Sequence, residues 1–330
     1  MEVWKDGCVD NDSHASIPPH VRTSTLTSLP DTPVDALDHC PLCHGDRFQP
    51  FLTCRDHTVS GKNFDIVECE DCGFRFTNPR PSAAEIEQYY ESDDYTPHQD
   101  AGRGLIDTLY RWARLYTLRS KHRLLTSLVA TPPGRLLDFG CGTGEFLTLC
   151  QSKGWAVRGL EPDPGAQAVA AEKHGLPVED PERIQALPPD RFDVITLWHV
   201  LEHIPHLSET IEQLKRTLAS TGTLVVAVPN CASLDAAFYG KDWAAYDVPR
   251  HLYHFRPDNV RRLFDQHAMT VRDIRPMRLD AFYVSLLSEQ YRDGWLLRAP
   301  VVALLSTLWA ARHEHRYSAQ LYLIRANDAP

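Results

Sequence analysis

The chain has 330 residues, 43% of them hydrophobic and 24% charged, which suits a folded protein with one main domain and a smaller one. This composition excludes wholesale disorder, collagen and coiled coil. The 44 acidic residues outnumber the 34 Lys and Arg residues, and the formal charge of −10 has the wrong sign for a protein that holds phosphate backbones by bulk charge.

The first 38 residues are expected to form a disordered tail. They hold seven acidic residues against Lys5 and Arg22 and are rich in Ser, Thr and Pro, so they have little apolar area to bury. The chain does not open on a basic stretch followed by an apolar one, as a secretory signal would. Its longest apolar run, 301–311, falls far short of the roughly 20 residues of a membrane span. We therefore expect no transmembrane helix and a cytoplasmic location.

Four of the nine cysteines form two C-x2-C pairs, Cys40 with Cys43 and Cys69 with Cys72. Thiolates at this spacing can close a tetrahedral shell around Zn²⁺, which leaves no position for a substrate. The spacing therefore predicts a structural zinc ribbon over residues 39–80, and so small a unit depends on the metal to fold. Reduced packing cysteines or a redox pair are the alternative. The segment has five Lys or Arg residues against six acidic ones, so it lacks the basic face of a nucleic-acid-binding ribbon.

Residues 81–130 are expected to form a helical linker or lid. Ser82, with Glu85 three residues on, has the pattern of a capping box, which predicts a helix from there to Tyr90. A second helix is predicted from about Leu105 to Leu128, where leucines recur at helical period.

From residue 131 the pattern changes to alternating strands and helices, which is typical of a doubly wound α/β sheet. The strand 135–139 runs into Gly140-Cys-Gly142-Thr-Gly144, a turn whose glycines let a ligand approach the backbone. The dinucleotide spacing of the third glycine is missing, and the acidic Glu145 disfavours a pyrophosphate at the following helix. Glu161 ends the next strand, where a carboxylate would accept hydrogen bonds from a ribose diol.

The alternation continues to the end of the chain. Strands are predicted at 156–160, 177–179, 191–197, 223–230, 270–274 and 320–324, with helices at 146–153, 165–174, 207–218 and 257–267. Residues 281–311 are expected to form an apolar helical insertion that covers the substrate pocket, makes a dimer contact or touches a lipid surface weakly.

Four ordered motifs carry a family resemblance, namely Asp138-Phe-Gly-Cys-Gly-Thr-Gly144, Gly159-Leu-Glu161-Pro, Phe192-Asp-Val-Ile-Thr-Leu-Trp-His-Val-Leu-Glu-His203 and Gly222-Thr-Leu-Val-Val-Ala-Val-Pro-Asn230. Over about residues 130–275 they resemble class I S-adenosylmethionine-dependent methyltransferases. With the cysteine ribbon in front, the chain resembles a bacterial subgroup that acts on small molecules and includes sugar C-methyltransferases.

The resemblance implies roles for individual residues toward the cofactor. It implies that Asp138 and the glycines Gly140, Gly142 and Gly144 hold the methionine part of S-adenosylmethionine. It implies that Glu161 holds the ribose hydroxyls, that Asp180 or a neighbour holds the adenine amine, and that His199 borders the cofactor.

The segment from His199 to His203 also has the pattern H-x-x-E-H, which on a helix could place two imidazoles around a hydrolytic zinc. It stands at the end of an apolar strand, and Pro205 follows at once. A metallopeptidase site is therefore not favoured.

Residues 243–255 gather histidines, an arginine, acids and aromatic residues in one loop after the fifth strand. In a doubly wound sheet this loop lies at the carboxyl edge of the strands, beside the methyl donor. A hydroxyl or an acidic carbon needs a base to take its proton. We expect His251 to be that base and place Tyr246 second, with a hydrogen-bonded loop anchor as the alternative for His251. Arg250 would either grip an anionic substrate or pair with Asp247.

The sequence thus predicts a Rossmann-like methyltransferase domain over 131–330, behind a zinc ribbon and a helical linker. The expected reaction is methyl transfer to a small molecule, with a sugar or glycan precursor favoured and no nucleic-acid partner. An RNA methyltransferase whose ribbon binds nucleic acid and a non-catalytic cofactor-binding scaffold are the alternatives. The acceptor atom, which can be oxygen, nitrogen or carbon, and the oligomeric state stay open.

Overall fold

The computed structural model describes residues 34–82, 84–90 and 105–327, and of residues 105–114 the backbone only. The predicted tail lies outside the described residues up to residue 33. Its last part is ordered, because β1 (Val34–Asp35) pairs antiparallel with β5 (Arg80–Pro81), and the Leu37 amide donates to the Asn78 side chain at 2.8 Å. The prediction that the disordered tail extends to residue 38 is therefore wrong for its last residues, from Val34 on. Pairing with a distant strand leaves no local pattern in the sequence.

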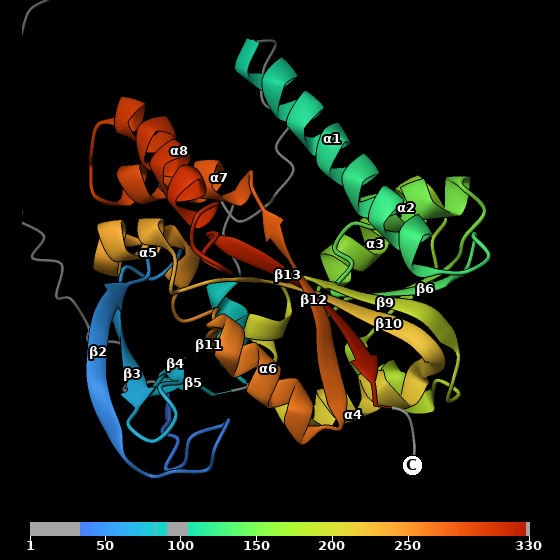
Figure 1. Cartoon of the computed structure of the whole chain (residues 1–330), viewed down its shortest axis with the longest axis horizontal. Helices are drawn as coiled ribbons and strands as arrows, with labels where there is room; N and C mark the ends of the chain where they lie inside the picture. The colour runs from blue at the N-terminus through green and yellow to red at the C-terminus, as the bar shows by residue number, and fades with distance from the viewer. Residues whose placement is uncertain (1–33, 83, 91–104, 328–330) are drawn as a thin grey trace, which may run out of the picture. The chain divides into compact units, whose positions relative to one another are not determined.

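The cysteine segment forms an antiparallel sheet whose strands run in the order β11, β4, β3 and β2 (Figure 1). Three of these strands belong to the predicted ribbon, namely β2 (Phe48–Arg55), β3 (Asn63–Cys69) and β4 (Arg75–Thr77). The fourth, β11 (Tyr253–His254), comes from the loop that was expected to face the substrate. The ribbon sheet is thus completed by a strand from the other part of the chain.

The linker differs from its prediction at the start. The described residues between Ser82 and Tyr90 form only a short 3-10 helix, η1 (Ile86–Tyr89), so the predicted α-helix is wrong. The Ser82 hydroxyl donates to the Glu85 carboxylate at 3.4 Å and does not accept from a backbone amide at a helix start, as a capping box requires. The second helix agrees with its prediction as α1 (Leu105–Leu128).

The main sheet has seven strands in the order β12, β13, β10, β9, β6, β7 and β8. Their bounds are β6 (Arg135–Phe139), β7 (Ala156–Leu160), β8 (Val178–Glu179), β9 (Phe192–Trp198), β10 (Leu218–Pro229), β12 (Met269–Met277) and β13 (Ala319–Ala326). Strands β6 to β10 are parallel, and β13 runs antiparallel to both of its neighbours. The strand order reverses between β6 and β9, which is where ligands bind in open sheets of this kind.

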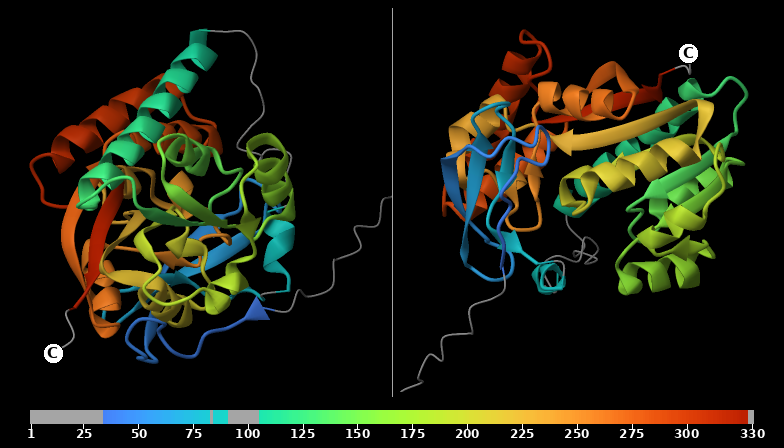
Figure 2. Two further views of the ribbon diagram at one scale, coloured as in Figure 1. Left: turned by 90° about the vertical axis from the view of Figure 1, so that its right-hand side faces the viewer. Right: turned by 90° about the horizontal axis from the view of Figure 1, so that it is seen from below.

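Helices cover both faces of this sheet (Figures 1 and 2). On one face lie α1, α2 (Glu145–Ser152) and α3 (Pro164–His174), and on the other α4 (Leu207–Thr217) and α6 (Pro257–Gln266). Side chains of β10 alternate accordingly, since Val225 packs toward the first group while Val226 packs toward the second. The doubly wound α/β fold predicted from the sequence is confirmed.

Three further helices, α5 (Leu234–Tyr239), α7 (Asp280–Tyr291) and α8 (Ala299–Ala310), pack against one another. The last two form the expected helical insertion, and many of their apolar side chains are exposed, among them Phe282, Val301 and Leu305. No helix in the part of the chain that the structure describes combines the length and the apolar character needed to cross a membrane.

A buried guanidinium joins the ribbon to the main domain. Arg250 is 1% exposed, and its guanidinium contacts Asp247 at 2.5 Å and Asp56 of the ribbon at 3.2 Å. It also donates to the carbonyl oxygen of Tyr89 in the linker at 2.9 Å. Of the two roles expected for Arg250, the structure therefore shows the pair with Asp247, and adds an acidic partner from the ribbon.

We predict that Arg250→Met destabilises the fold by about 3–5 kcal/mol, because it leaves Asp56 and Asp247 without their buried cation. The measurement is the denaturant midpoint of unfolding. The matched control is Arg261→Met, which breaks an exposed pair with Asp258 and should cost less than about 1 kcal/mol. Equal midpoints for the two variants would contradict the prediction.

Candidate active site

The glycine turn after β6 has one position that faces open space. Gly140, Gly142 and Gly144 have φ angles of 74°, 54° and 79°, which favour glycine. A Cβ atom at Gly140 would lie 2.4 Å from Val200, and one at Gly144 would lie 2.6 Å from Leu176. At Gly142 a Cβ atom would meet nothing within 4 Å. Gly142 therefore presents its backbone to a space that a ligand can enter.

Glu161 stands beside this space, directly after β7. One of its carboxylate oxygens accepts from the Gly142 amide at 2.8 Å and the other from the Asp163 amide at 3.1 Å. Burial raises the pKa of the Glu161 carboxyl, whereas these two amides oppose that shift. A carboxylate has about four acceptor positions, so Glu161 can still accept hydrogen bonds from a diol.

Asp180 follows β8, the next strand along the sheet edge. The side-chain amide of Gln167 joins it to Glu161, since it donates to the Glu161 carbonyl oxygen at 2.6 Å and to the Asp180 carboxylate at 3.3 Å. Asp180 is exposed. The structure thus brings the two acidic residues to neighbouring positions of one edge.

Asp138 lies at the carboxyl end of β6 and is buried. Burial raises the pKa of its carboxyl to about 7, although a 2.5 Å hydrogen bond from the Thr196 hydroxyl and the ammonium of Lys121 act in the opposite direction. The edge formed by β6, β7 and β8 therefore carries three acidic side chains, Asp138, Glu161 and Asp180.

His199 directly follows β9 in a left-handed conformation, with φ at 57°. Its Nε2 lies 3.1 Å from Asp280 at the start of α7, and its Nδ1 lies 3.6 Å from Glu202. Burial alone would lower the pKa of His199, but these two carboxylates raise it to about 9. His199 therefore lies at the carboxyl end of β9, the strand beside β6, between two acids that favour its protonated form.

The H-x-x-E-H segment does not lie on one helix. His199 stands in the turn after β9, and only Leu201–His203 is helical, as the short 3-10 helix η3. The His203 ring Nδ1 lies 3.1 Å from the Arg250 carbonyl oxygen and 3.0 Å from the Tyr90 hydroxyl, and burial lowers the pKa of His203 to about 4. The arrangement of two imidazoles on one helical face, which a metallopeptidase site of this motif needs, is absent from this segment.

His251 lies in the loop between α5 and α6, next to His203 and Glu202. Its Nδ1 lies 2.9 Å from the Ala245 carbonyl oxygen, an acceptor, so the tautomer of a neutral ring that suits this contact has its proton on Nδ1 and its lone pair on Nε2. Nε2 is 4.0 Å from the carboxylates of Glu202 and Asp247. Glu202 is fully buried, and neither of its carboxylate oxygens has a hydrogen-bond partner among the described residues. A proton taken up by Nε2 would thus gain two nearby negative charges.

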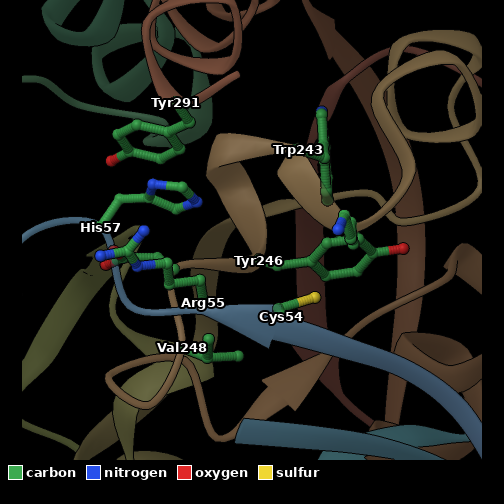
Figure 3. A pocket seen from close by; sticks show the side chains of 9 residues that line it. Cys54, Arg55, His57, Trp243, Tyr246, Val248 and Tyr291 are labelled. Carbon is green, nitrogen blue, oxygen red and sulfur yellow. The ribbon is translucent and has the colours of Figure 1, made fainter. Parts of the chain in front are cut away.

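Tyr246 lies in a different environment, on the side of the loop that faces the ribbon. Its ring packs edge-on against Trp243 and His254, with ring centroids 5.0 and 5.2 Å apart. It borders a small hollow between the loop and β2, where Figure 3 shows it near Cys54 and Trp243. Burial raises the pKa of the Tyr246 hydroxyl, which keeps the phenol neutral. This geometry favours His251 over Tyr246 as a proton acceptor.

The four cysteines of the ribbon come together. Their sulfur atoms all lie within 4.8 Å of one another, with Cys40 Sγ 3.6 Å from Cys72 Sγ and Cys43 Sγ 3.5 Å from Cys69 Sγ. Tetrahedral zinc with bonds of about 2.3 Å separates its sulfur ligands by about 3.8 Å, so the cluster has the dimensions of such a shell. Two of the ribbon arginines pair with acids, Arg47 with Glu70 at 3.5 Å and Arg75 with Glu68 at 2.6 Å.

Two residues of this region did not stand out from the sequence. Asp280 contacts His199 across 81 positions of the chain, and nothing local signals that pairing. Lys121 lies on α1 within the leucine repeat. A charged residue at an apolar position of such a repeat is a sequence signal that could have marked Lys121 as a residue of this region.

A family model described as a methyltransferase domain matches residues 109–272, which span the glycine turn and strands β6 to β10. The chain belongs to the class I S-adenosylmethionine-dependent methyltransferases. It is 29% identical over 138 residues to a ubiquinone biosynthesis O-methyltransferase of Xanthomonas campestris, and the match covers 39% of this chain and 57% of that protein.

A second methyltransferase matches at the same level of identity. A malonyl-acyl-carrier-protein O-methyltransferase of Serratia marcescens is 29% identical over 138 residues, which cover 41% of this chain and 53% of that protein. This methyltransferase chain thus spans a little over half the length of both relatives. The solved magnesium protoporphyrin IX methyltransferase of Synechocystis PCC 6803 superposes with a TM-score of 0.49 at 13% identity, over 74% of this chain and all of that one.

Proposed function

We propose that the chain transfers a methyl group from S-adenosylmethionine to a small-molecule acceptor. The observation that supports this most is the open space over Gly142, with the Glu161 carboxylate beside it and Asp138 at the end of the neighbouring strand. When bound, the cofactor supplies a methyl group on a positively charged sulfur, which an acceptor attacks in line.

In this proposal the acidic edge binds the cofactor. Asp138 and the glycine turn hold the methionine part, Glu161 the ribose hydroxyls and Asp180 the adenine amine, while His199 borders the site. The three carboxylates accept hydrogen bonds and the glycine turn offers a backbone that a ligand can approach, which matches the donors of an amino acid, a diol and an exocyclic amine.

His251 takes the acceptor's proton at Nε2 in this proposal, and Tyr246 stays the second choice. The Ala245 carbonyl fixes the His251 tautomer, and Glu202 and Asp247 stabilise the imidazolium that forms. A hydroxyl-bearing small molecule, such as a sugar or glycan precursor, is the acceptor class that needs this base. The relatives named O-methyltransferases are in keeping with an oxygen acceptor.

The ribbon is proposed to hold one structural zinc ion, coordinated by Cys40, Cys43, Cys69 and Cys72. Burial raises the pKa of the Cys40 thiol to about 11, so zinc binding would release the proton of this thiol. The proposed location is the cytoplasm, a compartment in which thiols stay reduced.

The zinc assignment predicts about one zinc per chain in the purified protein. The double variant Cys40→Ser with Cys69→Ser should lose the metal, because it removes one ligand from each C-x2-C pair. Cys54→Ser, a buried cysteine outside the cluster, serves as the control and should keep it. Elemental analysis gives the stoichiometry, and an unchanged value in the double variant would refute the assignment.

The cofactor site predicts that Gly142→Val abolishes S-adenosylmethionine binding, because its side chain fills the space over the turn. Gly175→Val is the matched control. Gly175 also has a positive φ, at 62°, and open space at its Cβ position, but it lies at the end of α3. Both variants should lose similar stability from backbone strain, roughly 1–2 kcal/mol, while only Gly142→Val loses the cofactor.

In the same calorimetric experiment, Glu161→Ala should weaken S-adenosylmethionine binding roughly tenfold to a hundredfold, because a charge-assisted hydrogen bond contributes about 1.5–3 kcal/mol. Unaltered affinity in both Gly142→Val and Glu161→Ala, with the fold intact, would reject the site.

If His251 is the base, His251→Ala should leave the affinity for the cofactor unchanged and lower turnover by roughly 10² to 10⁴. Tyr246→Phe keeps the packing of the ring and should have little effect. Turnover measured at saturating substrate over several pH values checks this. A His251→Ala rate within a factor of a few of the wild-type rate would remove His251 from the mechanism.

A further inference from the structure

The helical insertion carries most of the large apolar side chains that are exposed. Among the residues whose side chains the structure describes, 15 large apolar side chains are exposed, and 12 of them lie on α5 or between residues 279 and 308. Helices α5, α7 and α8 pack against one another, as Figure 1 shows, so these side chains gather in one part of the molecule. Single exposed apolar residues are normal on a protein surface, whereas a gathering of this size marks a binding face. We call the exposed apolar side chains of residues 279–308 the insertion face.

Helix α8 is apolar on both of its faces. One face packs against the protein, where Ala303 and Ser306 are buried and the Ser306 hydroxyl donates to Asp235 of α5 at 2.7 Å. The other face is a stripe of exposed side chains at helical spacing, namely Val301, Leu304, Leu305 and Leu308. None of the 12 residues of α8 is charged. A surface helix normally has charged or polar side chains on its outer face, so the outer face of α8 has the composition of a covered one.

The segment between α7 and α8 projects furthest. Trp295 is 69% exposed and Leu297 is 65% exposed, the two highest values among the exposed large apolar side chains of the described residues. Such side chains can enter the acyl region of a lipid layer without a preformed pocket. Tryptophan combines an apolar ring with an N–H group, which suits the boundary between lipid and water. The end of the insertion thus has the composition of a lipid-binding segment.

The exposed charges around the insertion face are mainly positive, in contrast to the chain as a whole. Residues 278–316 include five arginines and four acidic residues, whereas the chain has 34 Lys and Arg residues against 44 acidic ones. Two of the four acids have partners within the fold, since Asp280 contacts His199 and Glu289 is buried against Arg298. The charged residues of this range that are exposed are Arg278, Arg292, Arg312 and Arg316 against Asp293 and Glu314. Arginines around an apolar face complement a surface of anionic groups.

We propose that the insertion face docks on an anionic lipid surface. Trp295 and Leu297 enter the acyl region, and the surrounding arginines contact the headgroups. A second copy of the chain is the other occupant that an apolar face of this kind could have. A symmetric dimer, however, would bring the arginines of one copy close to the same arginines of the other. Helix α7 begins at Asp280, 3.1 Å from His199, so the helix that carries part of this face also contacts a neighbour of the candidate active site.

The test measures how the full chain binds to lipid vesicles in a sedimentation assay. The wild-type chain should bind vesicles of phosphatidylcholine with phosphatidylglycerol more tightly than vesicles of phosphatidylcholine alone, and salt should reduce this preference. Trp295→Ser with Leu297→Ser should weaken binding to both kinds of vesicle by roughly tenfold or more, because it removes the apolar side chains that enter the lipid. Val59→Ser with Leu115→Ser removes two exposed apolar side chains elsewhere and should leave binding unchanged.

A second pair of variants tests the charges. Arg292→Gln with Arg312→Gln should reduce the preference for the anionic vesicles by roughly tenfold to thirtyfold, since each basic residue near such a surface contributes to binding. Arg183→Gln with Arg191→Gln removes two exposed arginines outside the insertion and should keep the preference. All of the replaced side chains are exposed, so the denaturant midpoint of each variant should stay at the wild-type value.

Three outcomes would overturn the proposal. The first is a wild-type chain that does not bind the anionic vesicles, or that binds both kinds of vesicle equally. The second is equal weakening by the variants of the insertion and by their controls. The third is a wild-type dimer in analytical ultracentrifugation that Trp295→Ser with Leu297→Ser dissociates, without binding to vesicles, which would assign the face to a second copy of the chain. None of these outcomes concerns methyl transfer, so each would leave the proposed function standing.

Discussion

The position of the loop 243–255, which carries His251, depends on one buried cation. The guanidinium of Arg250 is held by acidic groups from the ribbon and from its own loop and by a backbone carbonyl of the linker, three segments far apart in the chain. A buried charge is stable only while its partners stay in place. The position of the neighbouring His251 is therefore set by contacts that lie largely outside the sheet.

The second constraint is the crowding of acidic side chains at the carboxyl ends of the strands. Asp138 and Glu161 both have raised pKa values because they are buried, whereas Glu202 and Asp247 have lowered ones because histidines or an arginine face them. Burial thus disfavours ionisation of the two carboxylates that are proposed to hold the cofactor, whereas the carboxylates near His251 face histidines or an arginine that favour their ionised form. His199 links the second set of carboxylates to α7, since its ring nitrogens lie 3.6 Å from Glu202 and 3.1 Å from Asp280.

The sequence predicted those parts of the molecule that local patterns determine. The alternation of strands and helices, the glycine turn, the bounds of α1 and the spacing of the cysteines depend on residues close in the chain, and the structure agrees with them. The α-helix predicted after Ser82 was wrong, since only the short 3-10 helix Ile86–Tyr89 forms there and its N-cap residue is Glu85, without a side-chain cap. The strand at Val34, the pairing of His199 with Asp280 and the partners of Arg250 depend on long-range contacts, which composition and periodicity do not encode.

The strand β11 ties the cysteine ribbon to the methyltransferase domain, so the two cannot be separated as independent domains. Tyr253 pairs with Phe76 of the ribbon, and Phe74 and Phe76 lie in the same hydrophobic core as residues of β9 and β10. A cut near residue 80 would leave an unpaired sheet edge on one side and exposed aromatic rings on the other. The cysteine segment is therefore no interchangeable module added to a methyltransferase, despite its compact motif in the sequence. Recombination or trimming at that boundary would break the folding unit that positions the loop 243–255. The two parts are therefore expected to evolve as one.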